Sequence, residues 1–218
     1  MSDAARAVEG AGPGESELSR ALAPLYREYL RRLEEMAARV KHTALLREPT
    51  TRDEAGLLVF GDDGFPLRFD LADNETGSTF EVRSARDDAP ALAQLRVGAL
   101  EVELKPGSWE ALRIDCRFDG APVPEDAVAL ASLLRAFAEL GHTGAFIERR
   151  DAQLWSGRIH SFSVKVDGPS ICATFDLGSC PPAALDVLLR ALDGFGRDRA
   201  PIARVIIGGP AADPKRTL

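Results

Sequence analysis

The sequence predicts an α+β fold: an antiparallel sheet of about five to seven strands with one face covered by helices, and an amphipathic helix at the N-terminus. Three observations lead to this prediction. Several short segments alternate apolar and polar residues, so each has one apolar face. Two longer segments are apolar over most of their circumference, which is typical of buried helices, and a third carries a single apolar stripe. A doubly wound parallel sheet would need strands that are apolar throughout.

The first element is the amphipathic helix, expected within residues 16–46. Its apolar residues recur at steps of three and four, which is the spacing of one helix face. Pro24 lacks the N–H that an internal turn needs, so we expect the main helix to begin there, after a short turn over 16–22. The stripe consists of Leu18, Leu22, Leu25, Tyr29, Leu33, Met36 and Val40.

Strands are expected where the alternation has a period of two. Clusters of Asp, Pro, Gly and Ser at 62–64, 106–108 and 167–169 are turn signals that separate them. The expected strands are 67–71, 80–82, 100–104, 112–118, 162–166 and 171–177, with the short apolar runs 57–60 and 205–207 as further candidates.

Two more helices are expected over 124–140 and 181–195. The polar residues in the body of each form one narrow stripe, so each helix is buried on more than one side. They pack on each other and on the sheet, or part of their surface meets a second subunit. Leu133–Phe137 resembles Leu188–Leu192 in sequence, and each follows two strands. This echo fits a tandem ββα repeat, through duplication or through two helices that meet the same packing demand.

The chain is expected to form one α+β domain over residues 16–208, in which the sheet and helices occupy 55–208. The segments 1–15 and 209–218 are expected to be disordered tails. The N-terminal segment has no basic region followed by an apolar core, so it does not have the pattern of a signal peptide. Three cysteines do not make a disulfide framework, and the excess of arginine over lysine is typical of GC-rich bacterial genomes. We therefore expect a cytoplasmic bacterial protein.

Charge narrows the choice of partner. The net charge of −7 argues against a general nucleic-acid binder, and the absence of a long apolar run argues against a membrane span. Residues 48–126 carry 8 basic and 18 acidic residues, so the whole excess lies there. This segment forms a solvated face, a docking surface for a partner with a basic surface, or a site for a divalent cation. The oxygen ligands of such a site would be Asp70, Asp73, Asn74 and Glu75.

Sequence motifs for catalysis are missing. The chain has no Gly-x-Ser-x-Gly nucleophile motif, no phosphate-binding loop and no His or Cys pair at metal-ligand spacing. We therefore name no catalytic, cofactor-binding or metal-binding residue, expect no cofactor, and favour a protein that is not an enzyme. By strand parity Cys116 faces the core, whereas Cys172 faces solvent and is the thiol to test for reactivity. His160 is a half-buried structural histidine or a catalytic group.

Candidate protein-interface residues lie on the first helix and at one turn. Trp109 follows Gly107 and Ser108, where a large ring either anchors a partner or lies over the rim of the core; Trp155 has the same alternatives. If the helix binds the partner, deletion of residues 1–47 should abolish partner binding or dimerisation. The candidates are Leu25, Tyr29, Leu33, Met36 and Trp109.

The order of elements from Pro24 onward is helix, several antiparallel strands, helix, two strands, helix. Over about residues 25–195, this order and the acidity resemble the type III secretion chaperone-like proteins. The resemblance implies a small, acidic, usually dimeric α+β protein without enzymatic activity, which holds partly unfolded polypeptides on its surface.

Our leading hypothesis is a non-catalytic protein-binding module, homodimeric and of the adaptor, chaperone or inhibitor type. One alternative is an enzyme or small-ligand receptor with a pocket between the sheet and the helices, because such pockets need no sequence motif. A second alternative is a structural subunit of a larger assembly.

Overall fold

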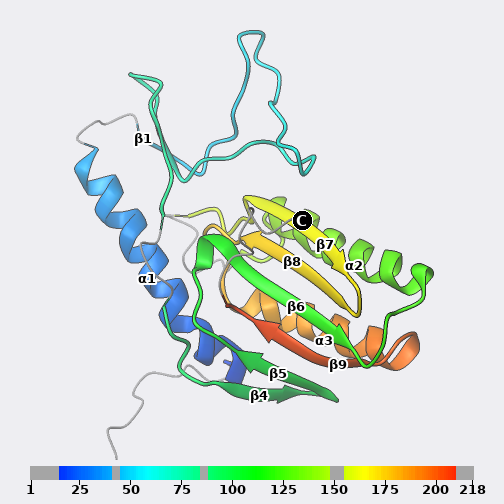
Figure 1. Ribbon diagram of the computed structural model, residues 1–218. Helices are drawn as coiled ribbons and strands as arrows, with labels where there is room; N and C mark the ends of the chain where they lie inside the picture. Colours follow the sequence, from blue (N-terminus) through cyan, green and yellow to red (C-terminus); the bar gives the residue numbers. More distant parts are fainter. Residues whose placement is uncertain (1–14, 41–44, 84–87, 148–154, 210–218) are drawn as a thin grey trace, which may run out of the picture.

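The computed structural model describes residues 15–40, 45–83, 88–147 and 155–209 (Figure 1). Within these ranges the chain forms three α-helices, a short 3-10 helix η1 (Trp109–Ala111), a six-stranded sheet and a three-stranded sheet. The α+β prediction is therefore confirmed. The expected disordered tails fall almost entirely outside the described residues.

The six-stranded sheet has the order β4-β5-β9-β6-β8-β7. Neighbouring strands of this sheet are antiparallel, except that β5 and β9 run parallel. β9 follows the last helix in the chain and lies between β5 and β6. The strands are β4 (Gln94–Val97), β5 (Leu100–Leu104), β6 (Leu112–Phe118), β7 (Ser161–Asp167), β8 (Ser170–Asp176) and β9 (Ile202–Ile207).

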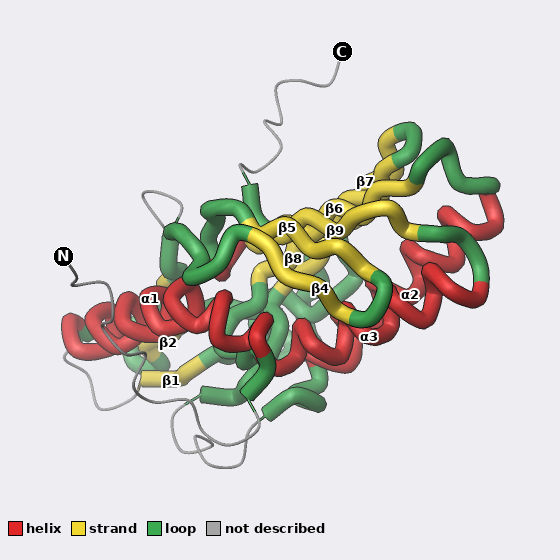
Figure 2. Tube along the Cα trace, turned by 90° about the horizontal axis from the view of Figure 1, so that it is seen from below, coloured by secondary structure: helices red, strands yellow, loops and turns green. Residues whose placement is uncertain are grey.

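One face of this sheet is packed and the other is open, as the alternation predicts. The helices α1 (Glu17–Arg39), α2 (Pro124–His142) and α3 (Ala183–Asp198) all lie on one side of the strands (Figure 2). Ile114 and Cys116 of β6 point into that core, whereas Asp115 between them lies on the other face. On the open face Asp115 pairs with Arg113 and Arg117, so charged side chains there satisfy one another.

Helix α1 runs unbroken from Glu17 to Arg39, so the expected start at Pro24 is wrong. Ser16 caps the helix by accepting a hydrogen bond from the Ser19 N–H, at 2.9 Å. Leu18 and Leu22, before the proline, are buried in the same core as the residues after it. Burial of this first segment outweighs the hydrogen bond that Pro24 removes, which costs about 3 kcal/mol.

Residues 48–83, which we call the arm, precede the strands of the main sheet and project above it (Figure 1). β2 (Leu71–Asp73) pairs with β1 (Leu45–Arg47) and β3 (Thr79–Phe80) in the small sheet. The expected strands 67–71 and 57–60 are mostly irregular ribbon held by isolated bridges, such as Thr50 with Arg68. Their apolar alternation therefore does not place them in the main sheet, because their backbone groups pair with other segments of the arm.

The expected ββα echo has unequal geometry in its two halves. β7 and β8 form an antiparallel hairpin before α3, but β5 and β6 before α2 are separated by β9. The matching helix sequences thus occur after two different strand arrangements.

Candidate functional site

A cluster of ionisable side chains is buried where the arm joins the main sheet. Glu48 and Asp70 lie side by side in the arm, where the Glu48 N–H donates to the carbonyl oxygen of Asp70. Tyr29 comes from α1. His160 immediately precedes β7, and Asp176 ends β8. The backbone N–H of His160 donates to the carbonyl oxygen of Asp176 at 2.8 Å, which brings these two strand ends together. We call these five residues the buried cluster.

Glu48 is fully enclosed, with 0% of its side chain exposed. Its Oε1 accepts hydrogen bonds from His160 Nε2 and from the Ser179 N–H, both at 3.0 Å. Its Oε2 accepts from the N–H and the hydroxyl of Ser156, at 2.6 and 2.5 Å. Glu48 also has a φ of 48°, in the left-handed region that non-glycine residues seldom adopt. Four hydrogen bonds thus hold one strained residue at the base of the arm.

His160 lies between Glu48 and two aspartates. Its Nδ1 is 3.5 Å from Asp70 Oδ1 and 3.7 Å from Asp176 Oδ2. Asp70 accepts hydrogen bonds from the Tyr29 hydroxyl and from the Val82 N–H. The imidazole therefore has carboxylates near both ring nitrogens.

These contacts separate the pKa values of the cluster. Burial raises the pKa of Glu48, but hydrogen bonds and the charge of His160 outweigh it and lower that pKa to about 2. Burial lowers the pKa of His160, but Asp176, Glu48 and Asp70 outweigh it and raise that pKa. Burial raises the pKa of Asp176 to about 7 and also raises that of Asp70. These shifts favour the ionised form of Glu48 and the protonated form of His160, and Asp176 is able to gain or lose a proton near neutral pH.

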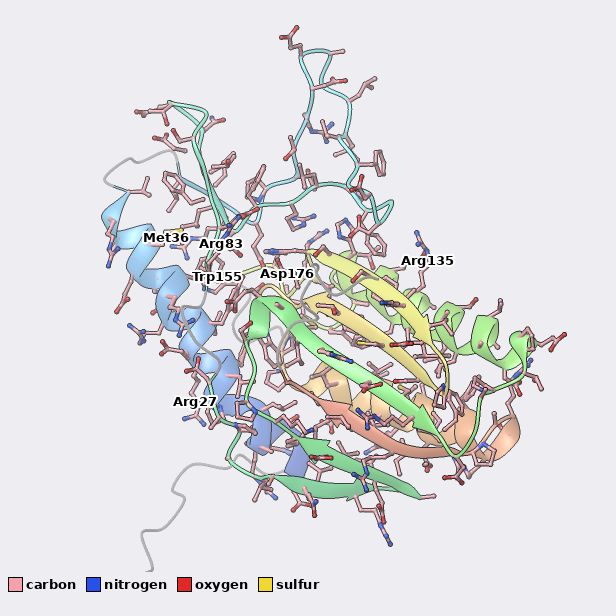
Figure 3. The ribbon with its side chains drawn as sticks, in the orientation of Figure 1. Arg27, Met36, Arg83, Arg135, Trp155 and Asp176 are labelled. Carbon is pink, nitrogen blue, oxygen red and sulfur yellow. The ribbon has the colours of Figure 1, made fainter. Side chains whose placement is uncertain are left out.

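A pocket of about 380 Å³ opens beside the cluster, between the arm and the adjacent ends of β7 and β8. Its size is in the range of small-ligand sites. His160 and Asp176 form part of its lining, and Asp176 retains 28% side-chain exposure. The carboxylate residues of the lining are Asp62, Asp63, Glu81, Glu110 and Asp176. Figure 3 shows Asp176 below the arm.

The arm is fixed over this pocket by residues 61–65. Asp63 accepts hydrogen bonds from the N–H groups of Phe65 and of Phe162 in β7, both at 3.0 Å. The Arg135 guanidinium of α2 lies 5.4 Å from the centre of the Phe65 ring and donates to the carbonyl oxygen of Asp63. Arg68, a cation of the lining, donates to the carbonyl oxygen of Glu48.

The arm carries exposed apolar side chains. Leu57 is 65% exposed and Phe60 is 59% exposed, and Leu58 and Leu67 are exposed as well. We call these four exposed side chains, which all lie within residues 57–67, the apolar patch. The arm as a whole has nine acidic and three basic residues, a net charge of −6. It therefore combines exposed apolar area with negative charge.

Most residues predicted to form an interface lie inside the protein. Leu25, Tyr29 and Leu33 are in the core between α1 and the rest of the chain, and Trp109 is 1% exposed. Trp109 therefore does not lie over the rim of the core, and these four side chains have no surface to offer a partner in the folded chain. Met36 is half-buried near the end of α1, so contact with a partner stays a prediction for that residue.

The other residues that the sequence singled out are also placed. Cys116 is buried and Cys172 half-buried, in line with strand parity, and burial raises the pKa of both thiols. His160 is buried rather than half-buried. In the acidic run at 70–75, the Asp73 carboxylate accepts hydrogen bonds from the Glu75 N–H and the Thr76 hydroxyl of the same loop. Among the described ranges, no three His, Cys, Asp or Glu side chains are grouped so as to hold a metal ion.

Trp155 is half-buried, and the Arg47 guanidinium lies 4.7 Å from the centre of its ring. Sequence reasoning missed Glu48, Asp70 and Asp176 as members of one cluster. Their only local signal is acidity, which they share with many surface residues.

Comparisons with known proteins add no family. No protein-family model, curated protein or solved structure matches the chain. Among the helices in the described part of the chain, none is both long and apolar enough to cross a bilayer.

Proposed function

We propose that the protein is a non-catalytic protein-binding module of the adaptor, chaperone or inhibitor type. The observation that carries this proposal is the apolar patch on the projecting arm. Exposed apolar area that stands clear of the main body is typical of interaction sites. The packed residues at the base of the arm present the patch on a fixed support.

The charge of the arm indicates the chemistry of the partner. A net charge of −6 over 48–83 favours a partner segment that carries basic side chains beside apolar ones. A second copy of the arm is equally acidic, so two arms repel each other. A homodimer, which native mass spectrometry of the full chain would report, must therefore use another surface.

The test is a selection of random displayed peptides on the full-length chain. Enriched peptides should combine Lys or Arg with apolar residues. Synthesised peptides should bind the Leu57→Ser/Phe60→Ser variant about tenfold or more weakly in fluorescence anisotropy, because two exposed anchors are lost. The matched control is Val128→Ser/Val187→Ser, which removes two exposed valines from α2 and α3.

Either of two results would overturn the proposal. One is a selection that enriches no peptide. The other is a set of peptides that bind the arm variant and the control variant equally well.

A specific observation favours a second candidate, a small-ligand receptor or an enzyme. It is the pocket beside His160 and Asp176, which lies under the arm rather than between the sheet and the helices. A titratable pair in a pocket is typical of binding and catalytic sites. A metabolite that raises the melting temperature of wild type but not of Asp176→Asn would support this candidate.

A further inference from the structure

The lining of the pocket under the arm is partly apolar and partly polar. Pro66 and Leu67 of the arm supply apolar lining, and His160 and Asp176, with the charged residues of the arm, supply polar lining. An occupant that satisfies both parts of the lining has an aliphatic stem and a polar or charged end.

The lining favours a positive end on that occupant. Five carboxylate residues face two cationic ones, Arg68 and His160. The carboxylate of Glu48 offsets the charge of His160, and Arg68 donates a hydrogen bond to the carbonyl oxygen of Glu48. Asp176 Oδ1 accepts from the Gly178 N–H at 3.0 Å, whereas Oδ2 is 3.7 Å from His160 Nδ1, beyond hydrogen-bonding distance.

The pocket is continuous with the docking surface proposed above. Leu67 belongs both to the apolar patch and to the pocket lining. A polypeptide that contacts Leu67 therefore lies at the mouth of the pocket, where one of its side chains can enter.

We propose that the pocket receives a lysine or arginine side chain of the partner segment that docks on the arm. The inference rests on the proposed function and names the residue type that the site selects. The aliphatic stem of that residue lies along Leu67 and Pro66, and its cationic group meets the carboxylate of Asp176.

The ionisation of Asp176 supports this assignment. Burial raises its pKa to about 7, with Asp70 and Glu110 adding to the effect and His160 opposing it. A bound cation favours the ionised carboxylate, so binding should release protons near neutral pH and strengthen as the pH rises. Loss of the His160 charge acts in the same direction.

The first experiment uses a probe that needs no knowledge of the partner. N-acetyl-arginine methylamide is titrated into the full-length chain, and backbone amide shifts are followed by NMR. The uncharged analogue N-acetyl-citrulline methylamide has nearly the same shape. We expect saturable shifts at Ser161, Ser163 and Thr174 with the arginine probe, and about fivefold weaker binding of the citrulline probe.

Variants locate the probe. Asp176→Asn should weaken the arginine probe about fivefold, and Glu125→Gln, an exposed acid on α2, should leave it unchanged. Ser163→Arg places a cation at an exposed lining position and should abolish binding, which gives a second test if Asp176→Asn does not fold. Equal binding of the two probes, unchanged binding by Asp176→Asn and Ser163→Arg, or shifts elsewhere would overturn the proposal.

A second experiment separates this inference from the proposed function. In a selected peptide, each arginine is replaced in turn by citrulline. If the affinity of the peptide depends on Leu57 and Phe60 of the protein but on no single arginine of the peptide, the pocket assignment is overturned. The proposal that the arm is the docking surface is then retained. Peptides that ignore the arm overturn the proposed function. A free probe that binds the pocket while peptides ignore the arm identifies a small-cation site and overturns the partner assignment.

Discussion

Glu48 Oε1 accepts a hydrogen bond from His160 Nε2 at 3.0 Å, across 112 residues of sequence. The pair joins the base of the arm to the beginning of β7. Four hydrogen bonds hold the Glu48 carboxylate in one position. They thereby stabilise the backbone of Glu48 in its left-handed conformation, with a positive φ. Glu48 therefore helps to set the orientation of the arm, together with the contacts of Asp63 and Phe65.

Replacement of Glu48 by alanine should destabilise the protein by ~3–5 kcal/mol. The change leaves His160 without its buried counter-charge and removes the acceptor of the Ser156 and Ser179 N–H groups. Urea unfolding measures the effect. Glu125→Ala, at an exposed position of α2, should stay within ~0.5 kcal/mol of wild type. A Glu48→Ala protein as stable as that control would contradict the assigned role.

The free energy of unfolding is expected to fall as the pH rises from about 4 to about 7. The pKa of Asp176 is raised from 3.8 to about 7, so the folded protein keeps a proton that the unfolded chain releases. The raised pKa of His160 continues this loss above its ordinary pKa of 6.5. The lowered pKa of Glu48 acts oppositely, since its stabilisation is complete above 4.5 and is lost toward about 2. Stability should therefore be greatest at mildly acidic pH.

The Asp176→Asn variant isolates the contribution of one group. Asparagine cannot ionise, so the variant should gain roughly 1–3 kcal/mol relative to wild type between about pH 4 and pH 8, after allowance for the partial exposure of Asp176. Chemical denaturation at both pH values measures the difference. A constant offset between the two proteins would show that Asp176 does not titrate in this range.

The stripe of α1 is expected to act in folding. Leu33 is fully buried, so Leu33→Ala should cost ~2–5 kcal/mol, whereas Leu140→Ala, at an exposed position of α2, should stay within ~0.5 kcal/mol. Deletion of residues 1–47 removes all of α1 and should unfold the chain, which circular dichroism would report. A folded truncated protein would contradict this role of α1.

Two glycines test the packing around the cluster. Gly178 and Gly168 both have positive φ, at 49° and 56°. A Cβ at Gly178 would lie 2.5 Å from His160 Nε2, whereas one at Gly168 meets open space. Gly168→Ala should cost about 1 kcal/mol for backbone strain alone, and Gly178→Ala a further ~1–3 kcal/mol. Equal losses in thermal unfolding would show that the region near His160 relaxes freely.

Local patterns account for the elements that were predicted well. The alternation at 100–104 and 112–118 coincides with β5 and β6, because a strand that faces a core on one side needs an apolar residue at every second position. The same pattern at 67–71 does not place that segment in the main sheet, since its backbone pairs with residues 49–51 and 59 of the arm. The expected helix start at Pro24 is wrong because the hydrogen bond that Pro24 removes is offset by the burial of Leu18 and Leu22. The sequence near Pro24 does not report that burial.

The sequence by itself determined the fold class, the one-sided helix cover and the acidity of the segment that became the arm. These follow from residue spacing over two to four positions and from composition, which act wherever the chain goes. Only the tertiary structure decided that most of the apolar stripe of α1 is buried, that the apolar patch is exposed, and that Glu48, Asp70, His160 and Asp176 meet. Their meeting depends on the path of the chain, because hydrogen bonds and charges act through distances in space and not along the sequence.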